Sequence, residues 1–265
     1  MKTEANGIQI HYELSGMDGA PVLMMSHSLS SDMDMWKPQL TSLENRFRIL
    51  RYDTRGHGTS DAPAPPYTLE QLAADAIGLI DSINIEKVIW VGLSMGGMIG
   101  QAIALNYPER LQALVLSDTA AVVEDEAQPV WEERINTAKT KGMEALADSI
   151  LERWFTPPFL RQNPPEVAMI RNQILSTPVQ GFVGCAEAIR HLNYLNRLHK
   201  INLPTLIMVG EYDNGTPLIC SETINQRIRN SVLSVIPNAA HLSNVEQPAI
   251  FNKRLSDFLT QCNLS

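Results

Sequence analysis

A single serine lies at the apex of a glycine-rich turn. The run Gly-Leu-Ser-Met-Gly-Gly occupies residues 92–97, after the apolar run 88–91 and before a helical pattern. Glycine-x-serine-x-glycine between a strand and a helix is typical of a strained turn that exposes a nucleophilic hydroxyl. Side chains at positions 92 and 96 would collide with neighbouring backbone, which explains the glycines. We therefore predict that Ser94 is a nucleophile; the alternative is a structural turn.

A serine hydroxyl is a weak nucleophile at neutral pH and needs a histidine base that an acid orients. Where the serine lies on such a turn between a strand and a helix, the acid and then the histidine follow it along the chain. Asp213 follows the apolar run 205–209, and His241 follows the run 232–236. Since the carboxyl ends of parallel strands meet at one edge of a sheet, we predict that Ser94, Asp213 and His241 form a catalytic triad.

Other acids and histidines offer alternatives. Asp118 ends the apolar run 111–117 and is the rival acid. Asp53 and Asp61 flank the turn 55–58, where short acidic side chains typically hold the turn by local hydrogen bonds. His57 lies in the same turn and is assigned a structural role. The remaining histidines precede the core loops or fall in the helical region described below: His11, His191 and His199.

Acyl transfer also requires two N–H groups that face the oxygen on which charge develops. Loss of one such donor costs on the order of 3 kcal/mol. The N–H of Met95, directly after the serine and at a helix start, is predicted to be one donor. The loop after the run 22–26 supplies the other, and we assign it to Leu29, with Ser28 as the alternative. A plain polar loop at 26–30 is the competing interpretation.

The elements that position these residues alternate along the first 121 residues. Thr68 with Gln71 is typical of a capping box at a helix start. Apolar strands that alternate with helices predict a mostly parallel sheet with helices on both faces. The predicted strands are 7–15, 22–25, 47–50, 87–92 and 111–117, and the predicted helices are 68–83 and 95–106.

Residues 122–200 differ, because helical patterns separated by prolines replace the alternation. The predicted helices there are 130–141, 143–155, 166–176 and 182–190. Alternation resumes with strand 205–209, helix 218–229, strand 232–236 and helix 246–260. We therefore predict an α/β fold with a mostly parallel central sheet: a core of residues 1–121 and 201–265, with a helical lid of residues 122–200 inserted between two strands.

Composition and net charge limit the classes of molecule that the protein is expected to bind. The 265 residues carry a net charge of −8, which disfavours nucleic-acid binding and a basic membrane patch. The N-terminus lacks the apolar segment of a signal peptide, and apolar runs fall short of the roughly 18 residues of a membrane span. Three scattered cysteines predict neither disulfides nor a metal site. We expect a cytoplasmic protein that acts on a small molecule without a metal or cofactor; its oligomeric state is not predicted.

Several motifs together resemble the 3-oxoadipate enol-lactonases of the α/β-hydrolase superfamily. They are residues 51–58, 66–68, 92–98, 142–147 and 153–156. The resemblance implies hydrolysis of a carboxylate-bearing enol-lactone in bacterial aromatic catabolism, without a cofactor, and carries the three triad residues over. One departure stands out: residues 27–30 read His-Ser-Leu-Ser, where those enzymes usually read Asn-Ser-Leu-Gly. Ser30 thus adds a side chain at the predicted pocket rim.

The lid is expected to select the substrate. Trp131 and Arg134 lie one helical turn apart and share a face. Arg134 is predicted to bind a substrate carboxylate while Trp131 packs on the ring, and the lactonases have this pair at the same spacing. The alternative is a surface Arg134 paired with Glu132 or Glu133 above a buried tryptophan. Met95 and Met98 are expected to line the pocket, and Trp154 and Phe155 to pack inside the lid.

The predicted function is therefore serine-dependent hydrolysis of an ester or enol-lactone, with 3-oxoadipate enol-lactone the preferred substrate. The alternatives are a general carboxylesterase or a lactonase of unrelated small esters. A cofactor-free perhydrolase tends to have a proline in the oxyanion loop, and residues 27–32 have none. A binding module that kept the fold usually loses a triad member.

Overall fold

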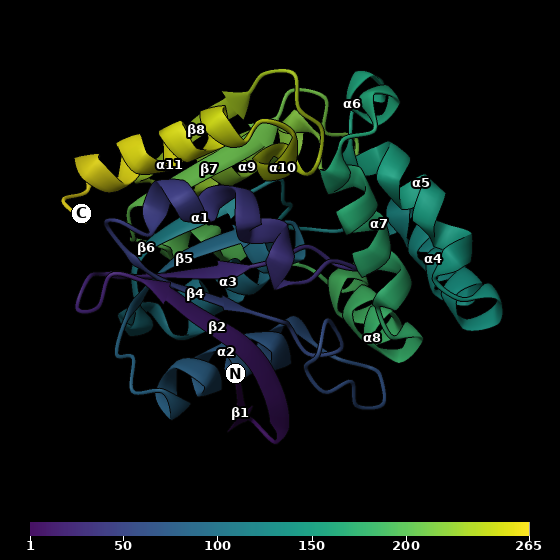
Figure 1. Ribbon diagram of the computed structural model, residues 1–265, viewed down its shortest axis with the longest axis horizontal. Helices are drawn as coiled ribbons and strands as arrows, with labels where there is room; N and C mark the ends of the chain where they lie inside the picture. Colours follow the sequence, from purple (N-terminus) through teal and green to yellow (C-terminus); the bar gives the residue numbers. More distant parts are fainter. Residues whose placement is uncertain (265) are drawn as a thin grey trace.

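The computed structural model describes residues 1–264 and centres on one eight-stranded sheet (Figure 1). The strand order is β1-β2-β4-β3-β5-β6-β7-β8. In this order the first two pairings, β1 with β2 and β2 with β4, are antiparallel. The remaining strands, β4-β3-β5-β6-β7-β8, all run parallel. The strands are β1 (Lys2–Ala5), β2 (Ile8–Gly16), β3 (Val22–Ser26), β4 (Arg48–Tyr52), β5 (Val88–Leu93), β6 (Leu111–Ser117), β7 (Thr205–Gly210) and β8 (Ser231–Ile236).

Helices cover both faces of the sheet, which explains why β5 and β7 are buried along their whole length. Helices α1 (Lys37–Leu43) and α11 (Pro248–Gln261) pack together on one face (Figure 1). Helices α2 (Leu69–Ser82) and α3 (Met95–Asn106) cover the other. Helix α9 (Leu218–Arg227) contacts β7 and β8, and the short α10 (Ser243–Glu246) precedes α11.

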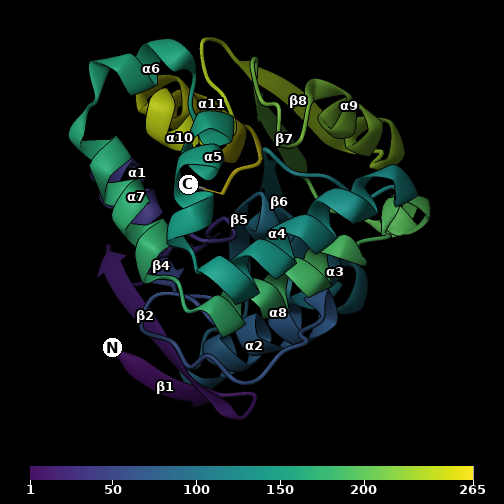
Figure 2. The same ribbon diagram turned by 90° about the vertical axis from the view of Figure 1, so that its right-hand side faces the viewer.

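Five helices between β6 and β7 form a separate layer beside the sheet (Figures 1 and 2). We call α4 to α8 the helical layer. Helix α4 packs against both α8 and α5, and α5 packs against α7. The members are α4 (Gln128–Lys141), α5 (Glu144–Trp154), α6 (Pro157–Gln162), α7 (Pro165–Ser176) and α8 (Val179–Arg190). Short 3-10 helices complete the chain: η1 (Met33–Trp36), η2 (Pro108–Arg110), η3 (Asp125–Ala127) and η4 (Leu195–Lys200).

The predicted fold class is confirmed, and α3 and β6 have the predicted bounds. Thr68 caps α2 and accepts a hydrogen bond from the Gln71 N–H, as the capping box indicates. The short elements β1, α1 and α6 were not predicted. Helix α6 begins at Pro157, which was interpreted as a break. Proline suits the first turn of a helix because the N–H that it lacks has no intrahelical partner there.

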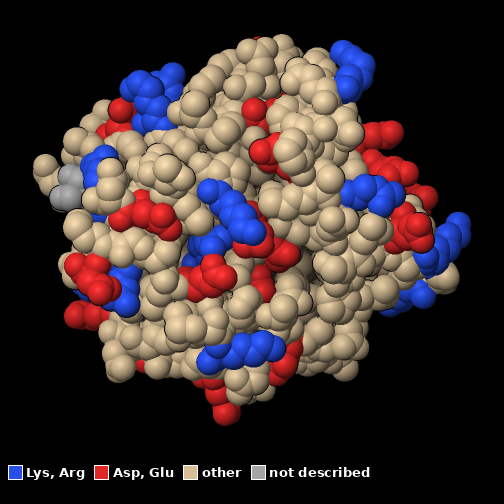
Figure 3. Space-filling model, viewed as in Figure 1, with Lys and Arg blue, Asp and Glu red and all other residues tan. Residues whose placement is uncertain are grey.

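Charge is dispersed over the face shown in Figure 3, where lysine and arginine side chains lie among aspartate and glutamate side chains. That pattern agrees with a net charge of −8 that is not gathered into one patch on this face. Within residues 1–264, no helix combines the length and the apolar character that crossing a membrane would require.

The helical layer meets the core where α8 crosses the turn 55–58. A Cβ atom added at Gly181 would overlap the carbonyl oxygen of Gly56, so the two backbones are in direct contact. Gly56 has φ +81°, a conformation that favours glycine. Three residues further along α8, a Cβ atom at Gly184 would meet the ring of Tyr67. Small residues on one face of α8 therefore allow the helical layer to pack closely against the core.

This contact predicts opposite effects of alanine at two helical glycines. Alanine at Gly181 should overpack the contact and lower the free energy of unfolding by about 1 to 3 kcal/mol. Alanine at Gly78 of α2 places its Cβ 3.3 Å from the Cβ of Ala5 and from the backbone nitrogen of Asn6, so it requires only a shift of a few tenths of an ångström at the turn between β1 and β2. Its better helix propensity should make that variant neutral or more stable by up to about 1 kcal/mol. Urea unfolding measures both, and equal effects would contradict the packing role of Gly181.

Candidate active site

Ser94 occupies a strained turn between β5 and α3. Its backbone has φ 56° and ψ −113°, a left-handed conformation that is uncommon for a residue with a side chain. The surroundings hold this conformation: the Ser94 N–H donates to the Ser117 carbonyl at 2.9 Å, and the Thr119 hydroxyl donates to the Ser94 carbonyl at 2.8 Å. Cβ atoms added at Gly92 and Gly96 would overlap backbone atoms, so both glycines are sterically required.

The three predicted triad residues lie within hydrogen-bond distance of one another. His241 Nε2 is 2.9 Å from Ser94 Oγ, and His241 Nδ1 is 2.9 Å from Asp213 Oδ2. Asp213 comes from the loop after β7 and His241 from the loop after β8, so both lie beyond the carboxyl ends of parallel strands. All three side chains belong to buried residues, at most 8 % exposed.

Asp213 is held as an anion by its own loop. Its Oδ1 accepts the N–H groups of Gly215 at 2.7 Å and Thr216 at 3.0 Å, and its Oδ2 accepts the Thr216 hydroxyl at 2.8 Å. Burial raises the pKa of Asp213, but His241 and the Thr216 donors outweigh burial and bring the pKa below its ordinary value. An ionised Asp213 can orient the imidazole so that Nδ1 carries the proton and Nε2 faces Ser94.

The rival acid, Asp118, is buried nearby and faces other groups. Its Oδ1 accepts the Gly210 N–H at 2.7 Å, and its Oδ2 accepts the Ser243 hydroxyl at 2.5 Å. Burial, together with the charge of Asp213, raises the pKa of Asp118 well above its ordinary value. Within the described residues Asp118 makes no hydrogen bond to His241, so its geometry suits a structural role.

The predicted oxyanion donors are the backbone N–H of Met95, directly after Ser94, and that of Leu29 in the loop after β3. Within residues 1–264 the N–H groups of Leu29 and Met95 have no acceptor, as a developing oxyanion would require. Leu29 and Ser28 both line the cavity above Ser94. The Ser28 N–H also has no acceptor in that range, so the choice between these two donors stays a prediction.

Two buried histidines hold the loop of residues 27–30, the predicted oxyanion loop, on either side of Leu29. His27 Nδ1 donates to the Ser28 carbonyl at 2.7 Å, and His57 Nε2 accepts the Ser30 N–H at 3.0 Å. Both rings must be neutral, because each uses its Nε2 as an acceptor: that of His57 from Ser30, and that of His27 from the N–H of Thr54. Burial, reinforced by His27, lowers the pKa of His57 to about 3. The sequence indicated only that His57 is structural, since the loop it contacts lies 27 residues away.

Above Ser94 lies a cavity between the core and the helical layer. Trp131 and Arg134 both line it, and the Arg134 guanidinium lies 5.0 Å from the centroid of the Trp131 ring. Glu132 pairs instead with Arg190 at 2.7 Å, and neither Glu132 nor Glu133 forms an ion pair with Arg134. Burial lowers the pKa of Arg134, which Glu133 partly opposes.

Sequence reasoning missed a second arginine at this cavity. Arg153 from α5 lines it with Arg134, and in residues 1–264 neither guanidinium group forms a hydrogen bond or an ion pair. Burial and the charge of Arg134 lower the pKa of Arg153 to about 10. Two like charges beside one cavity, without a carboxylate partner, suit the binding of an anion. The sequence holds no spacing that links residues 134 and 153, because their helices meet only in the fold.

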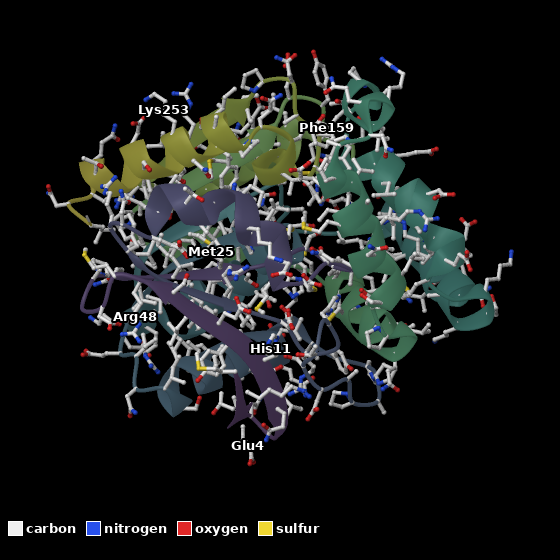
Figure 4. All side chains as sticks on the ribbon, in the orientation of Figure 1. Glu4, His11, Met25, Arg48, Phe159 and Lys253 are labelled. Carbon is white, nitrogen blue, oxygen red and sulfur yellow. The ribbon has the colours of Figure 1, made fainter. Side chains whose placement is uncertain are left out.

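The expectation for Trp154 was incomplete. Trp154 packs in the layer but also lines the cavity, and its ring centroid lies 6.3 Å from that of His241. Phe155 does not line this cavity, and its ring stacks on that of Phe159 with a centroid distance of 5.1 Å. Figure 4 labels Phe159 where α6 meets the C-terminal part of the core. The expected lining residue Met98 borders the cavity, whereas Met95 contributes no lining side chain.

The two other acids serve the turn 55–58 and its surroundings. Asp53 accepts the N–H groups of Met33 and Thr59 and contacts His11 at 2.8 Å. Asp61 accepts the Gln9 N–H at 2.8 Å. Across residues 1–264, no group of three or more acidic, histidine or cysteine side chains is arranged to hold a metal ion.

With this geometry in hand, comparison with known proteins defines the class. The chain belongs to the α/β hydrolase fold family, whose model matches residues 21–248, and it is a hydrolase. It is 32 % identical over 259 residues to 3-oxoadipate enol-lactonase 2 of Acinetobacter baylyi, covering 98 % of this chain and 96 % of that protein. The predicted resemblance to the enol-lactonases is thereby confirmed.

Two solved structures support the same grouping. The enol-lactonase of Burkholderia xenovorans superposes with a TM-score of 0.95 at 38 % identity, covering 98 % of this chain and all of that one. A thermophilic esterase of Thermogutta terrifontis, with malate bound, superposes with a TM-score of 0.93 at 30 % identity and covers 99 % of both chains. The similar proteins therefore include both a lactonase and an esterase.

Protonation of His57 should destabilise the folded protein at acid pH. Between pH 6.5, the ordinary pKa of histidine, and pH 3, the unfolded chain binds a proton at this residue that the folded chain does not. The free energy of unfolding should therefore fall by about 1.4 kcal/mol per pH unit from this group as the pH drops through that window. His57→Gln should reduce the slope in urea unfolding against pH. Exposed His191→Gln controls for the loss of a histidine, and an unchanged slope in His57→Gln would refute the account.

Proposed function

We propose that this protein is a serine hydrolase whose substrate is a small carboxylate-bearing enol-lactone, with 3-oxoadipate enol-lactone the best candidate. The proposal rests on the hydrogen-bonded chain from Ser94 through His241 to Asp213, beneath a cavity lined by two arginines that form no ion pair within residues 1–264. The similarity to enol-lactonases supports the choice of substrate.

In the proposed reaction His241 Nε2 takes the Ser94 proton as the hydroxyl oxygen attacks the lactone carbonyl. The 2.9 Å separation of these atoms is suited to that transfer. Asp213 stabilises the imidazolium that forms. The N–H groups of Leu29 and Met95 bind the oxyanion of the tetrahedral intermediate, and as fixed donors they need no reorientation when the charge develops.

Collapse of that intermediate breaks the ring C–O bond and expels the enol oxygen. The enol remains tethered to the acyl group, and His241 returns a proton to it. Water then attacks the acyl-enzyme, with His241 again accepting a proton, and releases Ser94. An enolate is a good leaving group, so no metal-assisted step is required by the chemistry.

In the proposed domain division, residues 122–200, which contain the helical layer, act as a lid that selects the substrate. Arg134 binds the substrate carboxylate and Trp131 packs on the ring, while Arg153 adds a second positive charge. Apolar side chains form much of the remaining wall, and a poorly hydrated site strengthens charge recognition. These wall residues are Met98, Leu146, Ile150, Phe182 and Ile189.

A general carboxylesterase is the second candidate function. The apolar wall favours it, because such a surface accommodates many acyl groups. The similarity to a Thermogutta terrifontis esterase also supports it, and that protein was solved with malate, an organic anion. Ser30, with φ 65° in place of the expected glycine, borders the cavity and alters the rim.

The triad assignment predicts a large difference between two buried aspartates. Asp213→Asn should lower kcat on the order of 10⁴-fold, because the imidazole loses its orientation. Asp118→Asn, which keeps an acceptor for Gly210, should lower kcat less than about tenfold. Steady-state hydrolysis of an aryl ester measures both, and thermal unfolding checks the fold. A greater loss in Asp118→Asn would assign the acid to Asp118.

Labelling tests the nucleophile directly. A fluorophosphonate probe should modify the wild-type protein at one site, and Ser94→Ala should abolish that labelling. Absence of labelling in the folded wild-type protein would overturn the hydrolase mechanism proposed for this site.

Substrate charge should decide how much each arginine matters. Arg134→Ala and Arg153→Ala should each lower kcat/KM for the anionic enol-lactone by about 10- to 100-fold, the value of a charge-assisted hydrogen bond. Turnover of a neutral aryl ester should change little. Arg197→Ala is a matched control, because Arg197 also lies over an aromatic ring, that of Tyr194, but outside the cavity.

The two outcomes separate the candidate functions. A wild-type protein that ignores the lactone, with ester turnover unaffected by Arg134→Ala, would favour the general carboxylesterase. Full lactone turnover in both arginine variants would contradict the carboxylate-binding role of the two arginines but would leave the proposed lactone hydrolysis intact.

A further inference from the structure

The segment that carries His241 is bonded to its surroundings on both sides of the histidine. On one side the Leu242 N–H donates to the Trp154 carbonyl, at the end of α5, at 3.0 Å. On the other side the Ala240 N–H donates to the Glu246 carboxylate at 2.9 Å. The Trp154 ring also packs near the imidazole. Three successive residues are thus held by the end of α5 and by Glu246.

Glu246 extends this connection to the helical layer. The same carboxylate accepts the Thr156 N–H at 3.1 Å and, at a short distance, the Thr156 hydroxyl. Thr156 caps α6 and follows α5 by two residues. One carboxylate, 6 % exposed, therefore joins the loop of His241 to the junction between α5 and α6.

The three donors are what a buried carboxylate needs. Burial raises the pKa of Glu246, and hydrogen bonds from Thr156 and Ala240 oppose that shift. Because both oxygens accept hydrogen bonds, the ionised form fits the site, and loss of one donor would leave a buried charge partly unpaired. The loop of His241 and the layer are thus coupled through the solvation of one group.

We propose that Glu246 is a positioning residue that joins the general base to the helical lid, by binding Ala240 beside His241 and Thr156 beside α5 with one carboxylate. The inference rests on the proposed function, in which His241 is the base. Helix α5 also carries Arg153 and Trp154 into the cavity. The packing of α5 against the core therefore positions the substrate-binding side chains and, through Glu246, also aligns the imidazole with Ser94.

Substitutions on each side of the carboxylate test this coupling. Glu246→Gln keeps the shape but removes one acceptor, and Thr156→Val removes the hydroxyl donor from the layer. Each should lower kcat for a neutral aryl ester on the order of 10- to 100-fold, as expected from slight misplacement of a catalytic group. KM should change less, and Thr156→Ser should restore kcat. The double variant Glu246→Gln/Thr156→Val should lose little more than either single variant.

A spectroscopic readout reports the base without any substrate. The proton between His241 Nδ1 and Asp213 should give a far-downfield proton NMR resonance, identified by its absence in Asp213→Asn. Glu246→Gln and Thr156→Val should weaken or broaden that resonance, and Thr156→Ser should keep it. This measurement distinguishes the two proposals, because it remains decisive even if the wild-type protein hydrolyses no ester.

Glu70→Gln is the matched control. Glu70 also accepts a hydroxyl hydrogen bond from a distant residue, Tyr194 at 2.7 Å, but contacts neither the His241 loop nor the layer junction. It should keep wild-type kcat and the downfield resonance. Wild-type kcat and resonance in Glu246→Gln would overturn the proposal, and so would equal losses in Glu70→Gln, which would indicate a general loss of stability.

Discussion

The arrangement of this protein depends on one imidazole that is held at both nitrogens. His241 meets Ser94 at Nε2 and Asp213 at Nδ1, each at 2.9 Å, although the three residues come from loops after β5, β7 and β8. A parallel sheet makes this possible because all of these strands end at the same edge. Glycine at position 210 allows this convergence. A Cβ atom there would overlap the Ala240 carbonyl, and because Gly210 has none, the loop of His241 lies directly against the end of β7.

Buried charge is distributed so that each group has a distinct task. Asp213 is satisfied by its own loop and stays ionised, whereas Asp118 is satisfied by Gly210 and Ser243 and holds strand ends together. The oxyanion loop is held by neutral histidines, which add no charge beside the site. Arg134 and Arg153 instead line the cavity, where neither forms an ion pair with another residue of 1–264, and they give a local positive site to a chain whose net charge is −8.

Local signals in the chain predicted much of this arrangement. The turn 92–97, the order of serine, acid and histidine, and the alternation of apolar strands with helices predicted the fold class and the convergence of Ser94, Asp213 and His241. Prediction failed where partners are distant. Arg153 joins Arg134 only because α5 packs against α4, and Trp154 reaches His241 only because the layer covers the sheet edge. Helix α6 was missed because its prolines signal both a break and a helix start.

The sequence by itself determined the class of chemistry, since a glycine-bounded serine, a strand-end acid and a strand-end histidine are local patterns with a fixed order. The sequence favoured Asp213 and kept Asp118 as the rival acid. Only the tertiary structure showed that Asp213 faces the imidazole, which side chains line the cavity and how the loop of His241 is bonded to the helical layer. These depend on hydrogen bonds between residues far apart in the chain, such as Glu246 with Thr156, which are 90 positions apart. No local propensity encodes such a contact, because it exists only once the layer has packed on the core.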